Sequence, residues 1–160
     1  MSLLKALYAV AIALLVVAFV GFGISAFYPA PEFPEYPPGL DLVGENPTAE
    51  EKELLAEQQK KEDAYQEQFS NYNQVVSSIA IGAAILLLVS SILWLSGLAV
   101  IGDGTTLGAV FTLFYGLIRA FMTESEQFRF VAVAIGLAIL LVLVYLKFVR
   151  TQSVRRVAQQ

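Results

Sequence analysis

The sequence predicts an all-α integral membrane protein, and three observations lead to this prediction. Hydrophobic residues make up 57% of the chain and charged residues only 15%, whereas a soluble domain has about 25% charged residues. Apolar runs recur along the chain, separated by polar segments, and about 20 apolar residues suffice for a helix to cross a bilayer. One long acidic stretch, residues 28–74, interrupts this pattern. We therefore expect four transmembrane helices and one long excursion from the membrane.

Three of the predicted helices come from runs that are clearly long enough to span. They lie within residues 1–27, which include a short leading segment, and within residues 75–101 and 130–149. A secretory signal peptide usually has an apolar stretch of about 7–15 residues, so the longer first run predicts an anchor that is not cleaved.

The third run, residues 107–122, is short and contains Arg119. It either spans, with Arg119 reaching the headgroups from its last turn, or forms a re-entrant or interfacial helix, which would leave three spans. Gly102, Asp103 and Gly104 before this run predict a tight turn at residues 102–106. Residues 123–129 are expected to form the opposite turn.

Charge asymmetry predicts the orientation, because basic residues near span ends mark the cytoplasmic side. The tail at residues 150–160 is basic, and Lys5 precedes the first run, whereas residues 28–74 contain eleven acidic residues and three lysines. We expect both termini in the cytoplasm and residues 28–74 outside it, in a plasma membrane of the prokaryotic inner-membrane type. Termini on one side require an even number of crossings, which favours four spans.

The excursion divides into a strap, residues 28–47, and a stalk, residues 48–74. The strap is rich in proline, which favours an extended polyproline II chain; its aromatic residues suit either a membrane-interface linker or recognition by a domain that reads such chains. Thr48 and Glu51 predict a capping box. No proline follows before Val100, so one helix of about 53 residues, close to 80 Å long, is expected.

One face of the stalk carries an apolar seam with heptad spacing towards its membrane end. This seam either touches the strap or packs against a neighbouring copy or another subunit. Its members are Leu55, Tyr65, Phe69, Tyr72, Val76 and Ile79.

Two further groups of residues are candidates for structural sites. Small residues that allow close helix approach recur at a spacing of four residues; they are Gly108, Thr112, Gly116 and Ala120, with Ala132 and Gly136 on the next run. Around the predicted outer turn lie four charged residues, Arg119, Glu124, Glu126 and Arg129. We expect these charges to pair and clamp helix ends; capture of a lipid headgroup or ligand is the alternative.

The composition also limits the chemistry. The absence of Cys and His removes disulfides, thiolate chemistry and the usual zinc and haem ligands. We expect no enzyme activity, no cofactor, no metal site and no nucleic-acid binding. The expected function is a membrane scaffold or accessory subunit that contacts the bilayer, further copies of itself or other subunits. The alternative is a conducting oligomer whose pore would be lined by Ser77, Ser78, Ser91, Ser96, Thr105 and Thr106.

Overall fold

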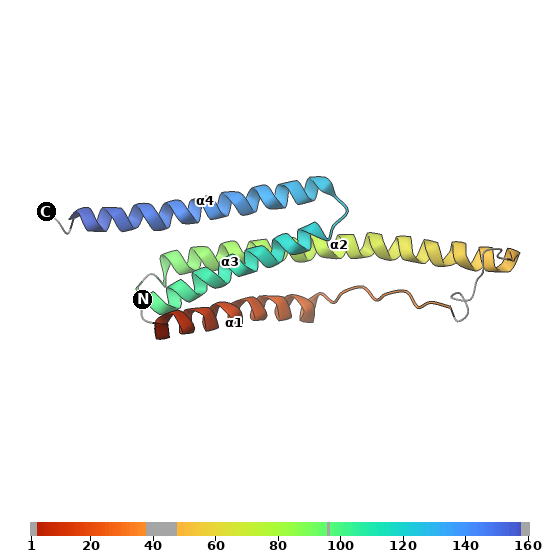
Figure 1. Cartoon of the computed structure of the whole chain (residues 1–160), viewed down its shortest axis with the longest axis horizontal. Coiled ribbons are helices and arrows are strands. Elements are labelled where there is room, and N and C mark those ends of the chain that lie inside the picture. The colour runs from red at the N-terminus through yellow and green to blue at the C-terminus, as the bar shows by residue number, and fades with distance from the viewer. Residues whose placement is uncertain (1–2, 38–47, 96, 158–160) are drawn as a thin grey trace.

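The computed structural model describes residues 3–37, 48–95 and 97–157, and side chains as far as Leu146. Within these residues the chain forms four helices and no strand (Figure 1). Each helix contains a stretch long and apolar enough to cross a membrane, so the predicted all-α fold with four such helices is confirmed. The helices are α1 (Leu3–Phe27), α2 (Ala49–Leu93), α3 (Ala99–Phe121) and α4 (Glu126–Val157).

Helix α3 is the central element of the bundle and contacts all three other helices. Buried residues make up 44% of its most apolar stretch, against 11% for that of α4. Because more of this stretch is buried against other helices than in α4, α3 can carry glycines, threonines and an arginine at low cost. Helix α3 has 23 residues and is about 35 Å long. It is therefore longer than the 16-residue apolar run that suggested a re-entrant segment.

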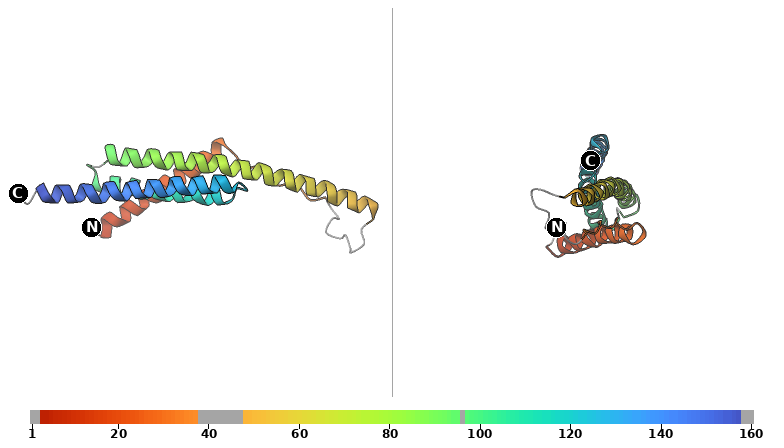
Figure 2. Two further views of the ribbon diagram at one scale, coloured as in Figure 1. Left: turned by 90° about the horizontal axis from the view of Figure 1, so that it is seen from above. Right: turned by 90° about the vertical axis from the view of Figure 1, so that its right-hand side faces the viewer.

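Helix α2 is a single helix of 45 residues, about 68 Å long. Its first half forms the stalk, which extends beyond the ends of the other helices (Figure 1; Figure 2, left). The capping box is present: the Glu51 backbone N–H donates to Thr48 Oγ1 at 3.4 Å, and the Thr48 backbone N–H donates to the Glu51 carboxylate at 2.6 Å. With its start capped and no proline to interrupt it, the stalk continues directly into the bundle.

The predicted turn at residues 102–106 is wrong. Helix α2 ends at Leu93 and α3 begins at Ala99, so these residues lie inside α3, and the second predicted span is shorter than residues 75–101. The reason is packing, since a Cβ on Gly102 would lie 2.6 Å from the carbonyl oxygen of Leu95. The glycine thus allows the true turn to fold back against the helix that follows it.

The boundaries of α4 also differ from the prediction. The outer turn is shorter than residues 123–129, because α4 already begins at Glu126 and the Ser125 hydroxyl accepts a hydrogen bond from the Phe128 backbone N–H at 3.3 Å. The helix extends to Val157, so residues 150–157 are helical rather than a separate tail. The predictions for residues 38–47, 158–160 and Ser96 lie outside the described residues.

Candidate functional site

The strap packs back against the stalk through a series of aromatic rings, which we call the aromatic ladder. Residues 28–37 are not helical and lie beside the stalk (Figure 1). Tyr28 stacks on Tyr72 with ring centroids 5.3 Å apart, and Phe33 meets Tyr65 edge-on at 5.0 Å. The Tyr36 hydroxyl donates a hydrogen bond to the Glu62 carboxylate. The ladder consists of Tyr28, Phe33, Tyr36, Tyr65, Phe69 and Tyr72.

The ladder accounts for the middle of the predicted stalk seam. Tyr65 and Phe69 stack on one another at 5.7 Å, and Val76 is fully buried in a cluster with Tyr72. The two ends of the seam lie apart from these contacts: Leu55 is 37% exposed and Ile79 is 45% exposed. Of the two arrangements considered for the seam, contact with the strap is therefore present within this chain.

At the base of the ladder, the guanidinium of Arg119 lies in a cage of neutral groups. Its Nη1 donates to Asn73 Oδ1 at 3.1 Å, and its Nε donates to the Tyr115 hydroxyl at 3.2 Å. The rings of Tyr72 and Tyr115 lie 5.8 and 5.4 Å from the guanidinium carbon, within range of cation–π attraction. Asn73 is fully buried and is fixed in turn by donating to the Phe69 carbonyl at 2.8 Å.

The other members of the predicted charge cluster also use neutral partners. Arg129 donates from Nε to the Thr123 carbonyl at 2.7 Å and from Nη2 to the same oxygen. The backbone N–H of Glu124 donates to the Ser70 hydroxyl at 2.9 Å, while the side chain of Glu126 is exposed. Within the described part of the chain these four charged side chains form no ion pair with one another. The expected pairing is wrong; polar contacts from Ser70 and Asn73 hold the turn to α2 instead.

The face of small residues lies where helices pack closely against one another. Gly108, Thr112, Gly116 and Ala120 are all buried. A Cβ on Gly116 would lie 3.2 Å from Ala80 Cβ on α2. On α4, Gly136 lies against Leu117, and Ala132 belongs to the same buried cluster as Ala120.

Sequence reasoning missed one end of this face and its partner on α1. Gly104, assigned to a turn, continues the spacing of four residues before Gly108, and its Cβ would lie 2.9 Å from Ile12 Cβ. Ala9 and Ala13 are the buried small residues of α1 that receive this face. The signal that was missed is the pair Ala9 and Ala13, four residues apart on the first run, together with Gly104, four residues before Gly108.

Most of the proposed pore residues are already used inside the bundle. The Ser91 hydroxyl donates to the Gly102 carbonyl at 2.9 Å and lies 2.7 Å from Thr106 Oγ1. Ser77 is fully buried, and Thr105 is 8% exposed. Ser78 is exposed and donates to the Gln74 carbonyl at 2.8 Å.

No protein-family model, curated protein or solved structure matches this chain. Function must therefore be argued from the chain's own contacts. Among the described residues, no three acidic side chains lie close enough together to hold a metal ion.

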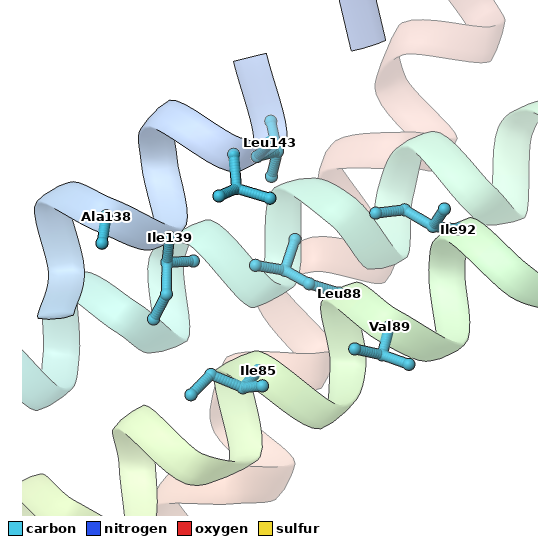
Figure 3. A pocket seen from close by; sticks show the side chains of 8 residues that line it. Ile85, Leu88, Val89, Ile92, Ala138, Ile139 and Leu143 are labelled. Carbon is cyan, nitrogen blue, oxygen red and sulfur yellow. The ribbon is translucent and has the colours of Figure 1, made fainter. Parts of the chain in front are cut away.

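Apolar grooves are open on the surface of the described part of the bundle, and two of them have linings that bear on function. One, of about 250 Å³, lies between α2 and α4, and Figure 3 shows side chains such as Leu88 and Ile139 lining it from the two helices. The other, of about 490 Å³, lies between α1 and α2 and includes Phe19 and Leu86. Their linings are almost wholly hydrocarbon, which suits acyl chains or apolar helix surfaces and offers no group for chemistry.

Proposed function

We propose that this chain is a non-enzymatic scaffold or accessory subunit of a membrane assembly, packing through its transmembrane helices and presenting the stalk to a partner outside the cytoplasm. The observation that carries the proposal is the stalk itself. One face of it is covered by the strap, whereas the other is exposed and acidic. A long helix that the strap supports along one face is suited to contacting a binding partner away from the bundle.

The charges of the exposed face favour a particular partner. Glu53, Asp63 and Glu67 are exposed, and the ion pair of Lys61 with Glu57 on the stalk, at 3.7 Å, is more than half exposed on both sides. Such surface pairs are weak, so this pair leaves the negative potential of the exposed stalk face in place. The stalk therefore fits a subunit with a basic surface better than the stalk of a second copy.

Assembly within the membrane would use the helices whose outer surfaces are least covered. Buried residues make up 17% of the apolar stretch of α1 and 11% of that of α4. Exposed apolar side chains include Phe19 on α1 and Val142 on α4. These surfaces suit contacts with a neighbouring copy or with other subunits.

The orientation belongs to the same proposal and rests on charge. The acidic stalk side is placed outside the cytoplasm and the basic C-terminal end inside it, in a plasma membrane of the prokaryotic type. A conducting oligomer is the alternative. It would need Ser77 and Ser91 to line a pore, but both are buried against other parts of this chain.

Purification in mild detergent tests the proposal. We expect stoichiometric partner subunits or a homo-oligomer, measured by native mass spectrometry. Reversing three stalk charges, Glu53→Lys with Asp63→Lys and Glu67→Lys, is expected to release a stalk-bound partner without changing the melting temperature.

The matched control adds three lysines to the stalk without removing an acid: Gln59→Lys, Gln66→Lys and Gln68→Lys. It should weaken the complex less than the charge reversal. A monodisperse monomer would overturn the scaffold function, and a homo-oligomer that conducts ions in liposomes would favour the conducting oligomer instead.

A further inference from the structure

Among the residues that the structure describes, Arg119 is a cation with unused hydrogen-bond donors and no carboxylate partner. A guanidinium has five N–H donors, of which one reaches Asn73 Oδ1 and one reaches the Tyr115 hydroxyl. The other three have no hydrogen-bond partner among the residues that the structure describes. The side chain is part-buried rather than enclosed, so these donors remain accessible from the surface.

The cage around Arg119 orients the guanidinium without neutralising it. An arginine remains charged at any physiological pH, and its contacts here are an amide oxygen, a phenol oxygen and the faces of Tyr72 and Tyr115. A part-buried charge without a counter-ion is costly. Glu124 follows within two turns of chain but is exposed and makes no ion pair with it. The site therefore lacks one component, an anion.

The position of the site indicates which anion would reach it. Arg119 is in the last turn of α3, and its partner Asn73 lies where the stalk joins the bundle. Tyr28, the first residue after α1, stacks on Tyr72 beside it. Clustered tyrosines are typical of the membrane–water interface, where lipid phosphates lie.

We propose that Arg119, held by Asn73, Tyr72 and Tyr115, binds a phosphate group. The planar guanidinium can offer two parallel N–H donors to phosphate oxygens. The group can come from an anionic phospholipid headgroup or from free inorganic phosphate. This site goes beyond the scaffold function and does not depend on it, since a chain that binds no protein partner would still bind the phosphate.

Thermal unfolding of the full chain in mild detergent tests this site. Phosphatidylglycerol in hundredfold excess over its dissociation constant is expected to raise the melting temperature by about 5 °C or more. Arg119→Gln should abolish the shift, whereas Lys60→Gln, which removes the same charge from the exposed stalk, should retain it. Phosphatidylcholine and inorganic phosphate are titrated in parallel.

A second variant keeps the test decisive if Arg119→Gln does not fold. Asn73→Asp places a carboxylate beside Nη1 of Arg119 and so supplies the anion from within the chain. This variant should lose the lipid-induced rise in melting temperature while it still unfolds cooperatively.

The lipid arms then identify the source. A shift with phosphatidylglycerol alone supports a lipid headgroup, and a shift with inorganic phosphate as well supports any phosphate group. A shift that survives in both variants, or no shift with either anion, overturns the proposal.

Discussion

Gly108 lies where α3 packs closely against α1. A Cβ there would lie 2.9 Å from Val16 Cβ and 3.2 Å from Ala13 Cα, and neither atom is the end of a flexible side chain. Gly108→Ala is therefore expected to destabilise the bundle by about 1–3 kcal/mol through overpacking. Reversible unfolding in mixed detergent micelles measures this difference.

Gly21 provides the matched control, because it lies in α1 and a Cβ added there would have no atom within 4 Å. Gly21→Ala should be neutral or stabilising by up to about 1 kcal/mol, through the higher helix propensity of alanine. Equal destabilisation by the two substitutions would contradict a packing role for Gly108.

Ser77 is fully buried in α2, and its hydroxyl has no hydrogen-bond partner among the described residues. An unsatisfied buried hydroxyl costs stability, so Ser77→Ala is expected to leave the free energy of unfolding unchanged or to raise it by about 1 kcal/mol. Ser91→Ala should lower it by about 0.5–1 kcal/mol, because Ser91 donates to the Gly102 carbonyl. The same unfolding assay compares them, and a loss at Ser77 as large as that at Ser91 would show that Ser77 has a partner.

At the scale of single residues, the sequence predicts which residues pack between helices better than it predicts the partner that each side chain contacts. The spacing of small residues singled out Gly108 and Gly116, which lie against Val16 of α1 and Ile81 of α2, because only small residues let backbones approach. Arg119 was expected to pair with an acid, yet it contacts Asn73 and Tyr115. Asn73 lies 46 residues from Arg119 in the sequence, and no local sequence pattern reveals a partner at that separation.

The strap is the element whose attachment depends most on single side chains. Phe33 contacts both Tyr36 and Tyr65, and aromatic pairs contribute about 0.5–1.5 kcal/mol beyond their buried area. Phe33→Ala is expected to release the strap and to accelerate proteolysis at residues 28–37. Phe27→Ala is the control, since Phe27 is 92% exposed and makes no ring contact in the described residues; faster cleavage in both variants would contradict the role of the ladder.

The start of the stalk is expected to depend on pH through its capping box. Hydrogen bonds from the Thr48 backbone N–H and hydroxyl lower the pKa of Glu51. A lowered pKa in the folded state means that this stabilisation is present above the ordinary pKa of a glutamate and is lost as the pH falls through the lowered value. Amide exchange in the first turn of α2, corrected for intrinsic rates, should accelerate over that acidic range.

Glu51→Gln separates titration from capping, because glutamine can form the same box without an ionisable group. In this variant the protection of the first turn should no longer change with pH over that range. A variant that retained the acid-dependent loss would assign it to another group.

Element boundaries were predictable where backbone chemistry decides them, and not where packing does. Thr48 and Glu51 marked the start of α2 because their hydrogen bonds are local. Gly102 and Gly104 resembled a turn, but their lack of side chains serves contacts with Leu95 and Ile12. A glycine pair looks the same in either role until the neighbouring helix is known.

The whole molecule makes a prediction about sidedness. Because the chain has no cysteine, single cysteines can be introduced at the exposed positions Gln59, Gln127 and Gly97. The 23 residues of α3, about 35 Å long, separate Gly97 from Gln127. We expect Gln59→Cys and Gln127→Cys to react with a membrane-impermeant thiol reagent from one face, and Gly97→Cys from the other.

The two possible failures of this labelling have different consequences. If Gln127→Cys reacts from the same face as Gly97→Cys, α3 does not cross, and three spans with a re-entrant third helix replace four. If Gln59→Cys and Gln127→Cys react from one face and Gly97→Cys from the other, but the face of Gln59→Cys is cytoplasmic, the four-span bundle is retained and the stalk is not extracytosolic. In that case the acidic face would serve a cytoplasmic partner, and the phosphate bound at Arg119 would belong to the inner leaflet, because the site and the stalk share one end of the bundle.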